Sequence, residues 1–467
     1  MRAPAFEALL TDAGREVLAG VDPKAAATDQ LAAASLLRGD PRVAALDPGL
    51  PVSELVNAVL TQVSLRERGR AKFGGLAERM FFTPNGLEQS TRRVVADYRA
   101  ERMAGAAGAV GTAGAAGAVG AAGAVGAAGI VGTAGDSGAA GSAEATGPSG
   151  WGLDGVTAGD LCCGVGADLL ALAARGVPVE GVDADPLTVA VARANIEALG
   201  LSGLARVREG DASATASGRY PLLFCDPARR GGRGRVFDPS AYSPPWDVAV
   251  DLAEGAEAAC LKAAPGIPHE ALPGTAAAEW ISVDGELKET ALWFGALADG
   301  PRHRATVLHE REGLLAREGA VAHLDADPGL GPAPVAAARR YLYDPDPAVV
   351  RSHLVAEAAA RVDGALLDER IAYFTADSAV FSPLWRVLEV VEVLPFSVKR
   401  LRSAVRGLGA GTVTVKKRGS AVDTEKLRRD LRASGPESVT VVLTRIGERP
   451  FCLLCREVGD PARGRGA

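Results

Sequence analysis

The sequence predicts an α/β protein built on a doubly wound, mostly parallel sheet, with a helical region before the sheet and a small α+β unit after it. The first indication is residues 156–168, which read as a short strand, a glycine turn and the start of a helix. The second is the alternation of short apolar runs and helical segments that follows. The third is a strand and helix order near the C-terminus that is typical of ferredoxin-like units.

Composition narrows the classes of function. At 467 residues the chain is long enough for two or three domains, at roughly 150 residues per domain. A formal charge of −6 argues against a uniformly basic protein that coats nucleic acid, although a local basic face remains compatible with it. Six cysteines in so long a chain do not form a disulfide framework, so we expect reduced thiols. Because the N-terminus shows no signal-peptide core, we expect a cytoplasmic protein.

The N-terminal region, residues 1–103, shows helical periodicity, clearest over 6–19 and 52–63. A basic cluster follows the second of these stretches: Arg66, Arg68, Arg70 and Lys72. The cluster is either a solvated helix face or a contact for RNA phosphates.

Residues 104–150 are nearly all Ala, Gly and Val. The stretch is long enough to cross a bilayer, but it has no block of Leu, Ile or Phe and no flanking aromatic belt. Frequent glycine also disfavours a helix, by roughly 1 kcal/mol per residue. We therefore interpret it as a flexible insertion and expect no membrane association.

The glycine turn and the strands after it carry the candidate ligand site. The first strand ends at Asp160 and turns through Gly164 and Gly166, where the missing Cβ lets the backbone approach a ligand. The second strand ends at Asp183, whose carboxylate can bind both hydroxyls of a ribose, and a third leads to Asp211. Acids at successive strand ends beside a glycine turn predict a nucleoside-binding edge.

The pattern Asp-x-x-x-Gly-x-Gly at 160–166 resembles the first motif of class I S-adenosylmethionine (SAM) methyltransferases, and Asp-Leu-Cys-Cys-Gly-Val-Gly is most similar to its form in RNA-modifying members. A dinucleotide fingerprint would need its third glycine at position 169, which is Leu169. The resemblance implies a Rossmann-like core of seven strands with SAM as cofactor. It implies these cofactor-binding residues: Asp160, Cys162, Gly164, Gly166, Asp168, Asp183, Ala184, Asp211 and Ala212.

In related methyltransferases, a segment before the sheet packs over the cofactor. Here this corresponds to residues 80–90, in which four residues are weaker candidates for cofactor or substrate contacts: Phe81, Thr83, Glu88 and Gln89. A helix cap with core aromatics explains the same segment equally well.

The fourth strand ends in Asp226-Pro227-Ala228-Arg229, which is similar to two family patterns. One pattern, (Asp/Asn/Ser)-Pro-Pro-aromatic, is found in enzymes that methylate exocyclic amines of adenine or guanine. The other, Asp-Pro-Pro-Arg, is found in RNA uracil C5-methyltransferases. The chain departs from both at Ala228 and lacks the Ser-Cys-Asn-Pro setting of the C5 nucleophile, so we favour an amine acceptor. The candidate catalytic residues are Asp226, Pro227 and Arg229.

The segment after this strand supplies two further candidates. Tyr242-Ser-Pro-Pro-Trp246 predicts a rigid loop, with Trp246 as a stacking surface for a flipped base. The arginines that precede it either bind phosphate or are solvated, and they are Arg229, Arg230, Arg233 and Arg235.

The C-terminal unit, residues 387–460, resembles the THUMP-like domain attached to a family of bacterial methyltransferases. The stretches that carry the resemblance are residues 396–402 and 412–419. True THUMP domains bind RNA in tRNA-modifying enzymes, so the resemblance implies an RNA partner. The unit is locally basic, which would give a salt-dependent affinity for RNA, or is simply a solvated face. Its basic residues are Lys399, Arg400, Arg402, Arg406, Lys416, Lys417, Arg418, Lys426, Arg428, Arg429 and Arg432.

No metal site is predicted, because His303, His309 and His323 lack the spacing of ligands and Cys452-x-x-Cys455 stands without a second pair. The segments expected are a helical region (1–103), an insertion (104–150), a methyltransferase core (151–330), a connecting segment (331–386) and the THUMP-like domain (387–460).

The favoured hypothesis is a SAM-dependent methyltransferase acting on a base amine of tRNA or rRNA. The alternatives are a methyltransferase for proteins or small molecules, and a non-catalytic RNA-binding protein that keeps the fold.

Overall fold

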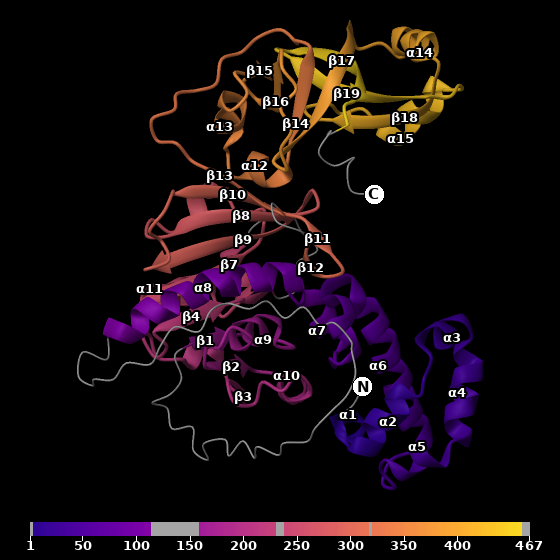
Figure 1. Cartoon of the computed structure of the whole chain (residues 1–467), viewed down its shortest axis with the longest axis vertical. Coiled ribbons are helices and arrows are strands. Elements are labelled where there is room, and N and C mark those ends of the chain that lie inside the picture. The colour runs from indigo at the N-terminus through magenta and orange to yellow at the C-terminus, as the bar shows by residue number, and fades with distance from the viewer. Residues whose placement is uncertain (1–2, 114–157, 230–237, 317–319, 460–467) are drawn as a thin grey trace, which may run out of the picture.

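The computed structural model describes residues 3–113, 158–229, 238–316 and 320–459 (Figure 1). The N-terminal region is helical, as predicted, and the long helix α6 is its centre. Its buried side chains, among them Leu55, Val59 and Val63, face the short helices before it. The elements are α1 (Ala3–Leu10), α2 (Asp12–Ala19), α3 (Pro23–Thr28), α4 (Gln30–Gly39), α5 (Pro41–Ala45), α6 (Val52–Phe73), the 3₁₀-helix η1 (Gly74–Glu78), α7 (Pro84–Gln89) and α8 (Arg93–Ala113).

The basic cluster on α6 makes contacts within the protein. Arg66 donates to the carbonyl of Met80 and its guanidinium lies over the ring of Phe81. Arg68 and Arg70 form ion pairs with Glu88 and Glu78. These residues therefore connect α6 to η1, to α7 and to the segment between them.

The Ala/Gly-rich stretch begins inside a helix. Helix α8 continues from Arg93 to Ala113, so the first ten residues expected in a flexible insertion are helical. The rest of that stretch, through residue 150, lies outside the described residues. Across the described part of the chain, no helix combines the length and the apolar character needed to cross a bilayer.

Among the described residues the main sheet has nine strands, in the order β13-β10-β8-β9-β7-β4-β1-β2-β3. The seven strands from β8 to β3 are those that the sequence predicts, including the antiparallel pair β8 and β9. Two further strands extend this seven-stranded core: β10 continues the sheet in parallel with β8, and β13 pairs antiparallel with β10. The strands are β1 (Ala158–Leu161), β2 (Val179–Asp183), β3 (Ala205–Glu209), β4 (Leu222–Cys225), β7 (Ala258–Ala263), β8 (Ala277–Val283), β9 (Glu286–Gly295), β10 (His303–Leu308) and β13 (Val321–Asp325).

Helices cover both faces of this sheet, because residues of one strand point alternately to opposite sides. On β4, Leu222 and Phe224 enter the core shared with α8, α9 (Ala167–Ala173) and α10 (Pro186–Ala198), whereas Leu223 and Cys225 face α11 (Trp246–Glu254). Since β1, β2, β4 and β7 are parallel, their carboxyl ends meet at one edge. That edge holds the candidate site.

A second sheet forms the C-terminal part, in the order β15-β16-β14-β17-β20-β19-β18. From β17 to β20 the elements follow the predicted order of strand, helix, strand, helix, strand, strand. The segment 331–386 supplies the other three strands, which the sequence analysis did not identify. The elements are β14 (Tyr341–Pro345), α12 (Pro347–Arg351), α13 (Val355–Ala360), β15 (Ala365–Asp368), β16 (Ile371–Ala376), β17 (Trp385–Pro395), α14 (Val398–Gly407), β18 (Ala410–Lys417), α15 (Thr424–Leu431), β19 (Glu437–Ile446) and β20 (Arg449–Glu457).

The two sheets share a hydrophobic core. Helix α12 packs against β8 and β10, where the main sheet ends in Figure 1. One cluster of buried side chains runs from Trp280 on β8 to Phe374 on β16. The hydroxyl of Ser282 donates to Asp346 at 2.6 Å across the same junction. The C-terminal sheet is therefore packed directly on the main sheet.

Candidate active site

The glycine turn after β1 has the backbone geometry that its sequence predicts. Gly164 and Gly166 have φ values of 57° and 92°, in the left-handed region that favours glycine. A Cβ at Gly164 would meet no atom within 4 Å, so the turn borders open space. Helix α9 begins directly after it, at Ala167. The turn therefore presents bare backbone toward a cavity.

Asp160, the last acid of β1, is a buried carboxylate without a partner. Its side chain is 0% exposed, and neither oxygen has a hydrogen bond of good geometry. Burial raises its pKa well above the ordinary value, and the nearby carboxylates of Asp168 and Asp226 raise it further, although the backbone N–H of Leu169 lies near enough to lower the pKa in part. A buried carboxyl group without a partner costs free energy, so the geometry favours a cationic or hydrogen-bonding ligand beside it.

Asp183, at the end of β2, connects two loops. Its Oδ2 accepts the backbone N–H of Gly164 at 3.0 Å, and its Oδ1 accepts that of Asp185 at 3.0 Å. Each carboxylate oxygen can accept a second hydrogen bond. Asp183 therefore holds the glycine turn against the end of β2 and keeps acceptor capacity for a ligand.

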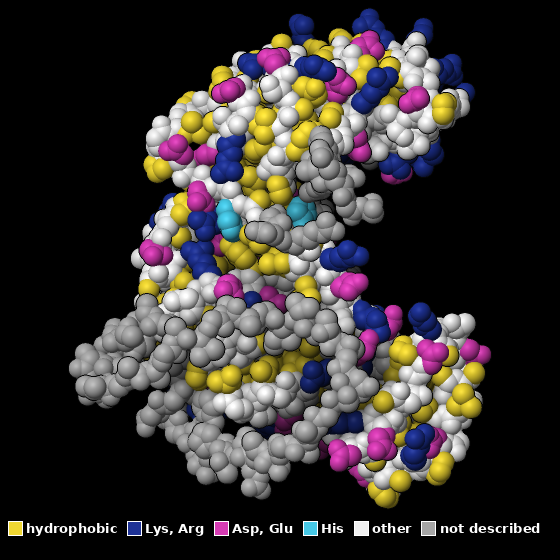
Figure 2. Space-filling view, in the orientation of Figure 1, with side chains coloured by type: hydrophobic (Ala, Val, Ile, Leu, Met, Phe, Trp, Pro, Cys, Tyr) yellow, Lys and Arg dark blue, Asp and Glu magenta, His cyan; other side chains and the backbone are white. Residues whose placement is uncertain are grey.

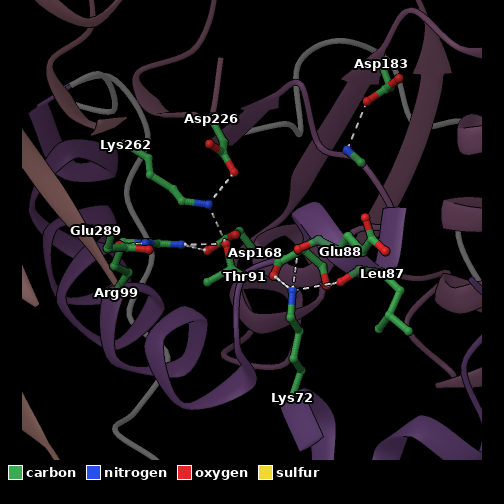
Figure 3. Close-up of polar contacts among 12 residues, drawn as sticks. Lys72, Leu87, Glu88, Thr91, Arg99, Asp168, Asp183, Asp226, Lys262 and Glu289 are labelled. Carbon is green, nitrogen blue, oxygen red and sulfur yellow. Dashed lines mark hydrogen bonds and ion pairs between the residues drawn. The ribbon is translucent and has the colours of Figure 1, made fainter. Parts of the chain in front are cut away.

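At the other end of the cavity, Asp226 follows β4 and forms an ion pair with Lys262 on β7. The Lys262 ammonium lies 2.6 Å from Oδ2 of Asp226 and 3.1 Å from the hydroxyl of Thr91 (Figure 3). The backbone N–H of Asp226 donates to Leu161, which fixes the residue beside β1.

Arg99 supports this region from beneath. It is 1% exposed, it forms ion pairs with Asp168 and Glu289, and its guanidinium lies 4.7 Å from the ring centroid of Phe224. The ion pair with Asp168 measures 2.5 Å. Since α8 carries Arg99, this buried network joins the helical region to the floor of the site (Figure 3).

Helix α7 forms a wall of the cavity, and Lys72 holds it in place. The Lys72 ammonium donates to the carbonyls of Leu87, Glu88 and Ser90 at 2.7, 2.7 and 2.8 Å, which satisfies the C-terminal end of α7. Burial, with help from the positive charges of Lys262 and Arg92, lowers the pKa of Lys72 to about 8. A basic residue of the predicted cluster thus has a structural contact at the site.

These elements enclose a cavity of about 1200 Å³. It brings together most of the predicted cofactor and catalytic residues, and of the weaker candidates it includes Thr83, Glu88 and Gln89. The predicted residues that line it are Asp160, Cys162, Gly164, Asp168, Asp183, Asp226 and Pro227.

Several predicted residues lie outside the cavity lining. Gly166 is the turn residue behind Gly164, and Ala184 is exposed. Asp211 is exposed and caps the 3₁₀-helix η3 (Ala212–Ala214), while Ala212 is buried. Their assignments as cofactor-binding residues stay predictions.

The structure does not place the predicted aromatic and arginine contacts of the acceptor in the described cavity lining. Trp246 is 8% exposed and packs on Tyr242 with ring centroids 5.3 Å apart, so the expected stacking surface is part of the core. Phe81 is likewise buried, at 1% exposure. Arg229 pairs through its backbone with Tyr242, and its side chain lies outside the described part. Arg230, Arg233 and Arg235 also lie outside the described residues.

The cysteines of β4 and β7 do not reach the cavity. Cys225 and Cys260 are both 0% exposed, and burial raises the pKa of Cys260 to about 12. Cys452 and Cys455 are buried on β20 and are not joined by a disulfide. Within the described ranges, no group of three or more His, Cys, Asp or Glu side chains is arranged to hold a metal ion.

Sequence reasoning missed Lys262 and Thr91. Lys262 sits in an apolar run that reads only as a strand, and Thr91 lies in a loop of the helical region. The available signal for Lys262 was its position: it is the last charged residue of the strand next to the one that ends at Asp226. No comparable signal in the sequence indicates Thr91.

The C-terminal unit exposes part of its basic set. In Figure 2, Lys and Arg side chains gather over α14 and α15. Lys416 and Arg418 instead bind Asp344 of β14 at 2.5 and 3.0 Å. The exposed members of the set without an ion pair to another described residue are Lys399, Arg400, Arg406, Lys417, Lys426, Arg429 and Arg432.

Comparison with known families covers both ends of the chain. Residues 385–457, which span β17 to β20, match the THUMP domain-like family. Residues 3–69 match a family described as a domain of unknown function.

The chain is also similar to individual proteins over most of its length. An uncharacterized S-adenosylmethionine-dependent methyltransferase of Mycobacterium tuberculosis, from strains CDC 1551 and H37Rv, is 31% identical over 408 residues, covering 85% of this chain and 95% of the relative. A proposed methyltransferase from Porphyromonas gingivalis W83 has a similar fold, with a TM-score of 0.62 and 17% identity over 91% of this chain and 96% of that one.

Proposed function

The chain belongs to the bacterial S-adenosylmethionine-dependent methyltransferases that carry a C-terminal THUMP-like domain, and from that premise we propose that it methylates an exocyclic amine of a base in tRNA or rRNA. The observation that carries the proposal is Asp226, whose second carboxylate oxygen accepts no hydrogen bond from a described residue and which lies at the opposite end of the cavity from Asp183. The cofactor supplies the methyl group on a sulfonium.

The residues of the cavity fit this cofactor. The unpartnered carboxylate of Asp160 matches the ammonium of its methionine part, and the open space over Gly164 admits its backbone. Asp183 keeps acceptor capacity for the ribose hydroxyls. We assign these three residues to cofactor binding.

Asp226 would position the acceptor. A conjugated amine is a poor nucleophile, and a carboxylate that accepts its N–H bond favours the electron-rich geometry needed for attack on the methyl carbon. A carboxylate can also take the proton that the amine must lose. Pro227, next in the chain, also lines the cavity.

An RNA substrate is supported by the exposed basic residues of α14 and α15. They form a locally positive surface on a chain whose net charge is −6. A chain that carries net negative charge repels RNA phosphates unless a local basic face binds them. The membership of residues 385–457 in the THUMP domain-like family supports the same substrate class.

The test combines methyl transfer with cofactor binding. Purified protein is incubated with radiolabelled SAM and with either RNA from cells lacking the gene or a protein extract from the same cells. We expect label in RNA. Asp226→Ala should abolish transfer while leaving SAM affinity, measured by titration calorimetry, within a few-fold, whereas Asp160→Asn should weaken SAM binding itself. Label confined to protein or small molecules would refute the RNA assignment.

A further inference from the structure

Asp226 and Lys262 stand opposite each other on neighbouring parallel strands. The register of β4 and β7 pairs Cys225 with Leu261, so the next residue of each chain segment is Asp226 and Lys262. Residues opposite each other in parallel strands project to the same side. Their side chains are 29% and 17% exposed, and both line the cavity. The ion pair therefore presents one surface to whatever occupies this end of the cavity.

This surface has unused hydrogen-bonding capacity on both partners. The Lys262 ammonium has three N–H donors, of which one goes to Asp226 and one to the hydroxyl of Thr91. The third has no acceptor among the described residues. The Thr91 hydroxyl also accepts from Arg99 at 3.3 Å, which fixes the position of the ammonium. Oδ1 of Asp226 is equally without a described donor, so the pair offers one acceptor beside one donor.

Resting on the proposed methylation of an RNA base, we infer that Asp226 and Lys262 together read the edge of the acceptor base, with Lys262 as a specificity-determining residue. Asp226 accepts an N–H of the amine, and Lys262 donates to an unprotonated ring nitrogen next to it. Adenine and cytosine present this pair on their Watson–Crick edges, the edge on which flipped bases are read. On its Watson–Crick edge guanine presents an N–H beside its amine, which would face the ammonium donor, and uracil has no amine.

The step balances with these groups. The lone pair of the amine nitrogen forms a bond to the methyl carbon while the carbon–sulfur bond breaks, and its electrons go to sulfur. The nitrogen then loses one proton to Asp226, which returns it to water. Lys262 keeps its proton throughout and only orients the base.

The first experiment identifies the product. Wild-type protein is incubated with SAM and with RNA from cells lacking the gene, and the RNA is digested to nucleosides for mass spectrometry. We expect N6-methyladenosine or N4-methylcytidine. Methylated guanosine, uridine or ribose would overturn the role of Lys262 but leave RNA methylation standing, whereas unmethylated RNA would overturn both.

The second experiment couples Lys262 to the ring nitrogen. An acceptor RNA is compared with the same RNA in which that nitrogen is replaced by C–H, as in 1-deazaadenosine or 3-deazacytidine. Lys262→Met should lower kcat/KM on the natural RNA about 10- to 100-fold, as expected for a lost charged hydrogen bond. Lys262→Arg, which keeps a donor, should retain part of the activity. The exposed Lys24→Met on α3 is the control for loss of a lysine charge.

The deaza RNA separates base reading from structural support. The kcat/KM of wild type should fall by a similar factor on the deaza RNA. Lys262→Met should have nearly the same kcat/KM on the deaza RNA as on the natural RNA. SAM affinity should stay within a few-fold in all variants. The inference would be overturned if Lys262→Met fell below wild type by the same factor on the natural RNA and on the deaza RNA, or if wild type ignored the deaza substitution.

Discussion

Asp183 accepts a hydrogen bond from the backbone N–H of Gly164, with 3.0 Å between the amide nitrogen and Oδ2. The bond joins the end of β2 to the glycine turn that follows β1, so a single side chain sets the shape of the turn and faces the proposed ribose position. Its other oxygen accepts the backbone N–H of Asp185. The geometry of the turn therefore depends on a residue 19 positions away in the sequence.

This relationship predicts the effect of Asp183→Ala on cofactor binding. The variant loses the hydrogen bond to the turn and the acceptor for the ribose hydroxyls. Hydrogen bonds to charged groups contribute about 1.5–3 kcal/mol, so the Kd for SAM should rise about 10- to 100-fold. Titration calorimetry measures the change, with the exposed Asp299→Ala as the control. An unchanged Kd would show that the turn and the ribose do not depend on this carboxylate.

The strand-end acids could be predicted from the sequence because each follows a short apolar run, and parallel strands bring their carboxyl ends together. Asp160, Asp183 and Asp226 accordingly line one cavity. Lys262 could not be assigned in the same way, since its pairing with Asp226 depends on the register of β4 and β7. The position of Lys72 depends on how α6 packs against α7, which periodicity does not specify.

The two strands that extend the main sheet beyond its predicted core, β10 and β13, could not be predicted for a related reason. The strands β10 and β13 lie at one edge of the sheet, and a strand at an edge is defined by its pairing partner more than by its own composition. Trp246 was expected at the mouth of the site because of its Pro-Pro neighbours, but it begins α11 and packs on Tyr242. Local motifs therefore located the ligand edge, and tertiary packing determined which side chains reach it.

The buried ion pairs of Arg99 predict a large loss of stability in Arg99→Met. The substitution leaves the carboxylates of Asp168 and Glu289 buried without their cation, and breaking a buried pair in this way costs about 3–5 kcal/mol. Urea unfolding monitored by circular dichroism measures the free energy of unfolding. The exposed ion pair of Arg68 and Glu88 is the control, because Arg68→Met should cost at most about 1 kcal/mol. Similar losses in both variants would contradict the structural role of Arg99.

Three histidines at the junction of the two sheets predict a loss of stability in mild acid. The rings of His269 and His353 stack 3.8 Å apart, and His303 meets His269 edge-on at 5.0 Å. Burial, followed by the nearby His269 and Arg302, lowers the pKa of His303 to about 4, and burial also lowers the pKa of His353.

The sign follows from proton binding. An unfolded histidine has a pKa of about 6.5, so between pH 6.5 and about 4 the unfolded chain binds protons that folded His303 does not. Stability should fall as the pH drops through this window and should be constant, with respect to this group, above it. Urea unfolding at several pH values from 7.5 to 4.5 measures the slope. His303→Asn should show a shallower slope than wild type, and equal slopes would exclude His303 as a contributor.

The basic residues of the C-terminal unit predict two separable effects, because some are exposed and others bind an acid. Lys399 and Arg400, on α14, are exposed and make no ion pair with a described residue. The Lys399→Gln/Arg400→Gln variant should bind RNA more weakly and lower the slope of log affinity against log salt by about 1.4, at roughly 0.7 for each of two phosphate contacts of single-stranded RNA. Its thermal stability should be unchanged. Lys24→Gln/Arg38→Gln, in the exposed N-terminal helices, removes the same charge and should leave the slope unaltered.

Lys416 provides the opposite case. Its ammonium binds Asp344, which also binds Arg418, so Lys416→Gln should lower the stability of the C-terminal sheet. Because Lys416 is half-buried in this contact, the variant should change the salt dependence of RNA binding less than the α14 variant does. Filter binding of bulk tRNA over a salt series, together with thermal unfolding of each variant, measures both effects. A salt slope that falls equally in the α14 variant and in Lys24→Gln/Arg38→Gln would mean that RNA senses only the total charge of the chain, and α14 would then have no particular role in binding.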